Sequence, residues 1–140
     1  MLTLICHVRA ELGERLSLSG TPLGERAIAE VKALTMSGNR LNASLAGKAA
    51  ADWLIVAPDR SFSLLDVRFT ARTDDDVLIF VQYNGRLRFS TEGHLHKVVV
   101  APRFETGDPR YAWLNGVQAV GNGEFDARAR SLRYAFYAVE

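Results

Sequence analysis

The chain has 140 residues, of which 48% are hydrophobic and 24% are charged, a composition typical of one ordinary globular domain spanning residues 1–140. Its 17 basic and 16 acidic residues leave a formal net charge of +1, which argues against a nucleic-acid partner. A single cysteine excludes an internal disulfide and any multi-cysteine zinc site. No apolar run reaches the ~20 residues of a membrane span, and residues 1–7 lack the basic region of a signal peptide. We therefore expect a cytoplasmic protein with no membrane partner.

The first third of the chain contains short apolar segments between turns. Residues 2–9 form an apolar run with β-branched side chains, which predicts a strand, and residues 20–24 contain the Gly and Pro of a turn. Residues 27–34 fit neither the helical nor the strand period cleanly, so both remain open for that segment.

The middle of the chain carries the clearest strand signals. Residues 53–57 predict a strand that ends at a turn over 58–60, and residues 63–73 alternate strictly between apolar and polar side chains. Residues 77–83 predict the next strand. Asn84-Gly85 follows it and predicts a hairpin turn, because a type I′ turn needs positive φ at both central positions.

The last third continues the same pattern. Residues 97–105 and 131–139 predict strands, whereas residues 111–120 begin as a helical turn and continue as a strand, and residues 121–123 predict a turn. About eight or nine strands at this spacing indicate an all-β domain, either a sandwich or a barrel. A closed or nearly closed antiparallel barrel is favoured because closure removes exposed sheet edges.

Two predicted strands are apolar on both faces, over residues 77–81 and 98–101. A strand of a half-solvated sheet carries polar residues on its outer face, so these two strands need a cover. Either a packed helix or a second subunit would provide it, and we favour a homodimer.

Several short motifs stand in order along the chain: Ala51-Asp52-Trp53, Leu65-Asp66-Val67-Arg68, Arg72-Thr73-Asp74-Asp75, Arg103-Phe104-Glu105-Thr106 and Tyr111-Ala112-Trp113-Leu114-Asn115. Together they closely resemble the bacterial and fungal family called domain of unknown function 3237, from about residue 24 to the C-terminus. The resemblance implies a small β-barrel of lipocalin-like or allene-oxide-cyclase-like shape. It implies no particular reaction.

The chain departs from the pattern of that family at three places. The family tends to have glycines where this chain has Ala33-Leu34, Ala49-Ala50 and Asp76. Loss of a glycine changes which backbone conformations a turn can adopt and how closely a ligand can approach the backbone. The departures suggest a diverged, specialised member.

The polar face of the strand over residues 63–73 is the most informative candidate site. It carries Asp66, Arg68, Thr70 and Arg72, and neighbouring side chains on one face of a strand are close enough to pair. The face is either a solvated surface or, as the resemblance favours for Asp66 and Arg68, the wall of a polar cavity. In the second case Asp66 would act as an acid or base and Arg68 would stabilise an oxyanion.

A second candidate group surrounds the predicted loop at 106–110. Arg103 and Glu105 share one face of a strand, and a carboxyl group beside an aromatic ring such as Trp113 is arranged for general acid or base catalysis. The alternative is that Trp113 is core and Glu105 caps the loop. The complete candidate set is Asp66, Glu105 and Arg68 as catalytic residues, with Asp52, Trp53, Arg72, Tyr83, Arg103, Tyr111, Trp113 and Asn115 as substrate-binding residues.

Asp52 and Trp53 stand at the start of a predicted strand. Asp52 either caps the turn before its strand or lines the mouth of the barrel, and Trp53 is most simply a core residue.

No metal or cofactor site is expected. His94 and His96 fall on one face of a strand, but no third ligand accompanies them, and Cys6 lies in an apolar strand where a thiol serves as packing. The chain has neither a nucleophile elbow nor a phosphate-binding glycine loop.

The sequence thus predicts a cofactor-independent enzyme. It would bind a mainly apolar, carbonyl- or hydroxyl-bearing metabolite and carry out cyclisation, isomerisation, hydration or dehydration. A non-catalytic carrier of a small molecule is the alternative, and a structural subunit that uses its apolar outer faces is a third reading.

Overall fold

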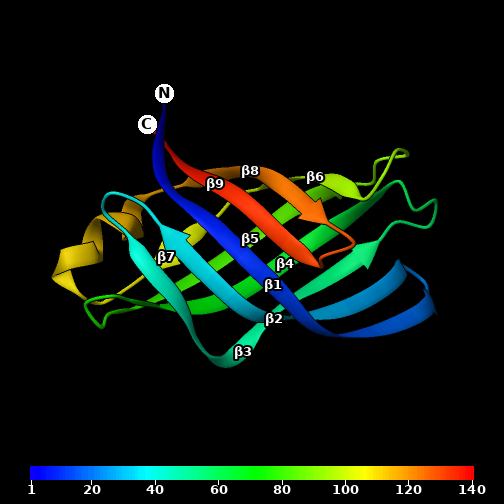
Figure 1. The fold of residues 1–140 in the computed structure, drawn as a ribbon, viewed down its shortest axis with the longest axis horizontal. Helices are drawn as coiled ribbons and strands as arrows, with labels where there is room; N and C mark the ends of the chain where they lie inside the picture. Colours follow the sequence, from blue (N-terminus) through cyan, green and yellow to red (C-terminus); the bar gives the residue numbers. More distant parts are fainter.

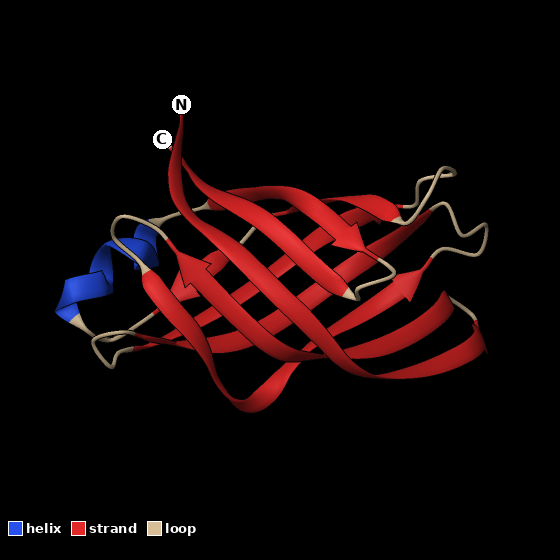
Figure 2. Cartoon of the chain, viewed as in Figure 1, coloured by secondary structure: helices blue, strands red, loops and turns tan.

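A computed structural model describes residues 1–140 as a β-barrel with one short helix (Figures 1 and 2). Nine strands and a 3-10 helix follow one another along the chain: β1 (Leu2–Thr21), β2 (Gly24–Ser37), β3 (Asn42–Val56), β4 (Phe62–Thr73), β5 (Leu78–Arg88), β6 (Leu95–Val100), β7 (Arg103–Glu105), η1 (Pro109–Gly116), β8 (Ala119–Asp126) and β9 (Ser131–Val139).

Eight of the strands form a closed ring. Each strand from β1 to β6 pairs with the next, β6 pairs with β8, β8 with β9, and β9 returns to β1, all in antiparallel register. The short strand β7 pairs with β5 beyond the end of β6. The predicted all-β barrel is therefore confirmed, and closure leaves no long unpaired edge in the sheet.

Strand alternation separates the interior from the surface. In β4 the side chains of Leu65, Val67, Phe69 and Ala71 are buried, while the polar residues between them are partly or fully exposed. The same period-two burial recurs in β5, β6 and β9. Because successive side chains point to opposite faces, the apolar half of each strand fills the barrel. The segment over residues 27–34, left open by its sequence, is part of β2.

Two predicted turns are wrong. Asn84 and Gly85 lie within β5, where Gly85 pairs with Leu65 and Val100, and residues 121–123 lie within β8. At Gly85 a Cβ atom would collide with the backbone oxygen of Val99, so the glycine is needed for close strand approach rather than for a turn.

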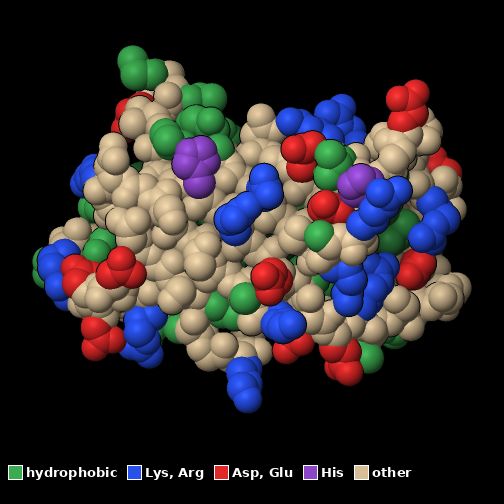
Figure 3. Space-filling view, viewed as in Figure 1, with side chains coloured by type: hydrophobic (Ala, Val, Ile, Leu, Met, Phe, Trp, Pro, Cys, Tyr) green, Lys and Arg blue, Asp and Glu red, His purple; other side chains and the backbone are tan.

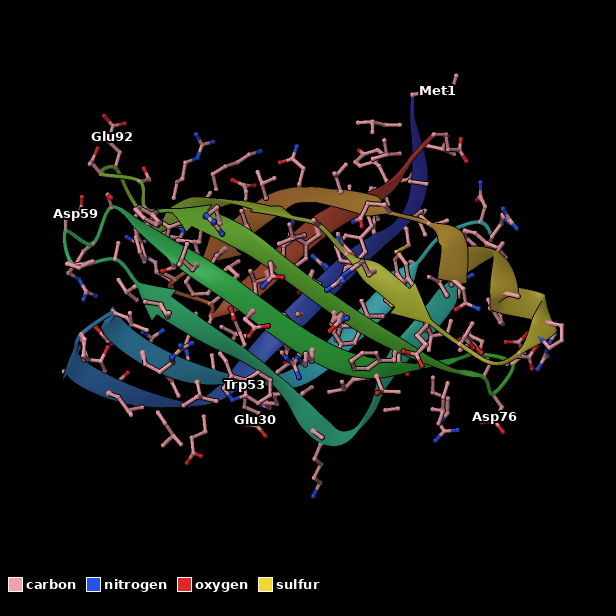
Figure 4. All side chains as sticks on the ribbon, turned by 180° about the vertical axis from the view of Figure 1, so that it is seen from behind. Met1, Glu30, Trp53, Asp59, Asp76 and Glu92 are labelled. Atoms are coloured by element: carbon pink, nitrogen blue, oxygen red, sulfur yellow. The ribbon has the colours of Figure 1, made fainter.

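The two ends of the barrel are built differently. At one end η1 lies over the interior and buries Leu114, with Arg40 stacked 3.8 Å above the Trp113 ring (Figure 1). The predicted helical turn leading into a strand at 111–120 is thereby confirmed. At the opposite end lie only the β1–β2 hairpin and the connections at 57–61, 89–94 and 127–130. In Figure 4, two of these connections can be found by the labelled residues Asp59 and Glu92. The labelled residue Asp76 lies in a turn at the η1 end.

The turn at Asp76 keeps the geometry of a glycine. Asp76 has φ 69°, which lies in the left-handed region that glycine adopts most easily. The departure from the family pattern at this position therefore changes the side chain without abolishing the turn.

No helix packs on the outside of the sheet. Leu78 in β5 and Val99 in β6 are 50% and 46% exposed, so the idea that a helix covers these strands is wrong. Hydrophobic side chains also gather near the two termini (Figure 3), where Met1, Leu2 and Val139 are exposed. A homodimer stays a prediction. The structure contains no helix with the length and apolarity needed to cross a membrane.

Candidate ligand cavity

A cavity of about 220 Å³ occupies the barrel interior on the side away from η1. It reaches the surface at Arg60, whose side chain is 63% exposed. Fifteen of its 19 lining residues are hydrophobic, and the charged or hydroxyl-bearing residues among them are Arg15, Asp52, Arg60, Ser63, Tyr83 and Tyr134. An apolar cavity with a few convergent polar groups is the usual form of a small-molecule site.

The strand register arranges most of these polar groups in two rows. In the deeper row, Ala29, Asp52, Val67 and Tyr83 oppose one another across β2, β3, β4 and β5, and Arg15 of β1 opposes Ala29. In the outer row, Glu25, Val56, Ser63 and Leu87 oppose one another on the same four strands. The rows are four residues apart along β4, which corresponds to about 13 Å.

Asp52 points into the barrel because it shares the inward face of β3 with Leu54 and Val56. The backbone N–H of Asp66 donates to its Oδ1 at 2.9 Å, which fixes the carboxyl group against β4. Burial raises the pKa of Asp52 to about 6, although this hydrogen bond and the charge of Arg15 act in the opposite direction. A carboxyl group with such a pKa exchanges protons near neutral pH.

Tyr83 and Tyr134 form the floor of the cavity beside Asp52. Their ring centroids lie 5.9 Å apart in an edge-to-face arrangement, and Tyr83 meets Phe136 in the same way, also at 5.9 Å. Burial raises the pKa of both phenols above the usual value, and the charge of Asp52 adds to the shift. Both hydroxyls are therefore neutral at physiological pH. Tyr134 is hydrogen-bonded to Tyr83, which leaves the O–H of Tyr83 to donate to a ligand.

Ser63 supplies an unused hydroxyl in the outer row. The residue is only 1% exposed, and its Oγ is a buried side-chain polar atom without a hydrogen-bond partner. Buried polar groups are almost always paired, so an unpaired hydroxyl on a cavity wall indicates a position for a ligand atom.

Arg60 and Glu25 lie at the mouth, and Arg15, whose backbone is in the deeper row, reaches Glu25 with its side chain. Glu25 accepts from Arg60 at 2.9 Å and from Arg15 at 3.5 Å. The hydrogen bond from Arg60 and the charges of both arginines lower the pKa of Glu25, so the carboxylate is ionised. The group therefore carries two formal positive charges and one negative charge.

Nine of the eleven candidate residues from the sequence lie outside this cavity, and five of the nine are charged. Asp66, Arg68 and Arg72 are on the outer face of β4, so the inference that Asp66 and Arg68 face inward is wrong. The physical reason is that the other face of β4 is apolar and fills the core. Arg103 and Glu105 are exposed on β7 on either side of the buried Phe104, so they also point away from the interior.

The predicted aromatic residues divide between the surface and the η1 end. Trp53 lies on the outer face of β3, where it is 38% exposed, so its assignment to the core is wrong (Figure 4). Tyr111 donates to Asp75 at 2.6 Å, and Asn115 bonds both backbone groups of Thr106. Trp113 packs under Arg40. These contacts hold η1 in place, at the end opposite the cavity.

Asp52 and Tyr83 are thus the two candidate residues that the structure brings together inside the barrel. The sequence reasoning missed Arg15, Arg60, Ser63 and Tyr134. For Tyr134 a signal was present, because it alternates with Phe136 and Ala138 on the inward face of β9.

His96 and Cys6 take up packing positions. His96 accepts from the Ser90 N–H through Nδ1 and stacks against Phe89 and Phe125. Cys6 is buried, and burial raises the pKa of its thiol to about 12. No group of three His, Cys, Asp or Glu side chains is placed to hold a metal ion.

The fold and the cavity define a class, namely a closed antiparallel barrel that is plugged at one end and open to a small cavity at the other. The chain belongs to the family described as protein of unknown function (DUF3237), whose model matches residues 1–139. The resemblance read from the motifs is therefore confirmed. No curated protein gives a significant match.

Several solved structures share this fold. A β-barrel-like protein from Acinetobacter baumannii AYE is 24% identical with a TM-score of 0.88, covering 100% of this chain and 96% of its own. A conserved protein of unknown function from Rhodopseudomonas palustris is 21% identical with a TM-score of 0.89, covering 100% and 97%. A protein described as an enzyme, from Penicillium herquei, is 17% identical with a TM-score of 0.74, covering 99% and 94%. At these sequence identities, the structural similarity shows that the chain shares the fold of these proteins and nothing about its function.

Proposed function

We propose that this protein is a cofactor-independent enzyme that binds a small, mainly apolar molecule in the barrel and transfers a proton through Asp52. The observation that carries the proposal is the Asp52 carboxyl group inside an apolar cavity, with two neutral phenols beside it. A carboxyl group placed in an apolar pocket is a common arrangement for an enzymatic acid or base.

The raised pKa of about 6 gives Asp52 two roles. Above that pH the carboxylate accepts a proton from a ligand, and below it the carboxylic acid donates one. The backbone N–H of Asp66 holds one carboxyl oxygen, which leaves the other oxygen for the ligand.

The tyrosines would stabilise the charge that proton removal creates. When a base removes a proton next to a carbonyl group, negative charge develops on the carbonyl oxygen. A neutral phenol at hydrogen-bond distance stabilises that oxygen without a proton of its own being lost. Tyr83 and Tyr134 are the phenols that line the cavity.

Enolisation, isomerisation, cyclisation, hydration and dehydration all proceed through such a proton transfer beside a carbonyl or hydroxyl group. The ligand would therefore carry one of these groups on an apolar body. The description of the Penicillium herquei neighbour as an enzyme supports a catalytic role for this fold.

Deuterium incorporation tests the proposal without knowledge of the natural substrate. A panel of small ketones is incubated with the protein in D2O, and exchange at the carbon beside the carbonyl is followed by NMR. We expect exchange above the buffer rate with the wild type and at the buffer rate with Asp52→Asn. Glu105→Gln, which removes an exposed carboxylate outside the cavity, should exchange like the wild type.

A non-catalytic carrier is the outcome that would contradict the proposal. In that case the ketones bind to the wild type, and binding is seen in the same spectra as line broadening, yet no exchange above the buffer rate occurs at any pH between 5 and 8.

A further inference from the structure

The charged residues at the cavity mouth give information about the ligand that the proton-transfer step does not supply. Arg15 and Arg60 both line the cavity, and they share a single carboxylate, Glu25. Each guanidinium has five N–H donors, and each is joined to Glu25 through one nitrogen, so further donors of both side chains remain for another acceptor. On the face shown in Figure 3, basic side chains with acidic ones between them gather toward this end of the barrel.

Ser63 provides a second, independent observation at the same level of the barrel. It lies in the row of Glu25, Val56 and Leu87, so its unpaired buried Oγ faces the cavity just inside the mouth. The Ser63 hydroxyl and the two arginines line the same cavity, so all three are able to donate to a ligand there. A negatively charged oxygen satisfies all three groups at once.

The rest of the cavity wall is apolar apart from the deeper row. A cavity of about 220 Å³ is smaller than the ~300–1,000 Å³ of pockets that hold drug-sized ligands. The ligand is therefore a short molecule with an apolar body. Two carboxyl groups lie near this space: Glu25, which is paired with both arginines at the mouth, and Asp52, about 13 Å away along the strands from the outer row.

We propose that the ligand is a short apolar carboxylate whose charged end is held at the mouth by Arg15, Arg60 and Ser63, with its body extending toward Asp52. This inference rests on the proposed function only in requiring that the cavity bind a small molecule. The reverse orientation would place the carboxylate beside Asp52 and leave Ser63 unpaired. The reacting group of the ligand consequently lies several bonds from its carboxylate.

A pair of probes of equal size tests the inference without any need for turnover. Octanoate and octanamide differ in charge at one end, and the affinity of each is measured by isothermal titration calorimetry at pH 7. The wild type should bind octanoate about tenfold more tightly than octanamide, because charge-assisted hydrogen bonds are stronger than neutral ones.

The variants identify the residues responsible. Arg15→Gln combined with Arg60→Gln should bind the two probes within about twofold of each other while binding octanamide as the wild type does, which shows that the cavity is intact. Arg68→Gln combined with Arg103→Gln removes the same number of charges from the outer surface and should keep the tenfold preference.

Three results would overturn the inference. They are equal affinity of the wild type for the two probes, a preference that survives in the Arg15→Gln/Arg60→Gln protein, or a preference lost equally in the outer-surface control. Equal affinity contradicts the charge assignment and leaves the cavity as a binding site. Failure of both probes to bind the wild type contradicts the carboxylate inference and the proposed function together.

Discussion

The two ends of the barrel interior differ in what fills them. Near η1 the interior is filled by side chains, and Phe69, Phe136 and Leu114 are at most 1% exposed. Toward the mouth the inward side chains surround a cavity, and those of β4 on its wall are Val67, Leu65 and Ser63. The η1 end is therefore closely packed, whereas the end at the mouth is less closely packed and contains a cavity.

The largest contrast is expected from two truncations on β9. Phe136→Ala at the closed end should lower the free energy of unfolding by about 3–5 kcal/mol, because it leaves a void in a packed core. Leu132→Ala, which enlarges the existing cavity, should cost about 1 kcal/mol. Urea denaturation monitored by tryptophan fluorescence measures both. Equal losses would show that the open end is packed as tightly as the closed end.

Substitution of a glycine that lies between closely packed strands should lower the free energy of unfolding almost as much. Gly85→Ala adds a Cβ that collides with the backbone oxygen of Val99, so the free energy of unfolding should fall by about 2–3 kcal/mol. Gly107→Ala has no heavy atom within 4 Å of the added carbon and should be nearly neutral in the same urea experiment. A tolerated Gly85→Ala would mean that β5 and β6 can separate without loss of stability.

Asp52 should make the barrel less stable as the pH rises. Because its pKa is raised from 3.8 to about 6, the folded state binds the proton more tightly than the unfolded state. The contribution of Asp52 protonation to the free energy of unfolding is therefore fully present below pH 4 and is lost as the pH rises from 4 to 6. Asp52→Asn removes this loss and should be more stable than the wild type by about 3 kcal/mol at pH 8 and nearly equal to it at pH 4. An Asn variant that is less stable at pH 8 would show that the Asp66 N–H and the charge of Arg15 stabilise the carboxylate more than burial destabilises it.

The smallest effect is expected at Ser63. Its hydroxyl has no partner, so Ser63→Ala should change the free energy of unfolding by less than about 0.5 kcal/mol. Thr73 is buried at the closed end, where its hydroxyl donates to Asp75 and accepts from the Val77 N–H, and Thr73→Ala should cost about 1–2 kcal/mol. A large loss in Ser63→Ala would show that its hydroxyl is already paired in solution.

The fold could be read from the sequence because strand alternation depends on local chemistry alone. Alternation defines two faces of β4, and the apolar face of Leu65, Val67 and Phe69 is the one that the hydrophobic effect buries. The error at Asp66 and Arg68 arose because the family resemblance was given more weight than that apolar face.

The predicted turn at Asn84-Gly85 was wrong for a different reason. This dipeptide is a strong local signal for a hairpin, but the glycine serves a contact with Val99 on a strand that lies far along the chain. A single sequence does not show such tertiary contacts.

The cavity could be predicted only in part. Asp52 and Tyr83 were among the candidate residues, Asp52 as either a turn cap or a residue at the mouth of the barrel. Arg15, Arg60 and Ser63 were missed, because they are brought together by the register of β1 to β4 and by the turn at 57–61. Each of them by itself has the appearance of an ordinary surface residue.

The most direct test of the account is the titration of Asp52 itself. The 13C chemical shift of its side-chain carboxyl group, assigned by comparison with Asp52→Asn, is followed by NMR between pH 3 and 9. A carboxyl group held inside an apolar cavity should titrate with a midpoint at about 6. A midpoint near 3.8 would show that Asp52 is solvated, and it would contradict the role of a buried acid or base.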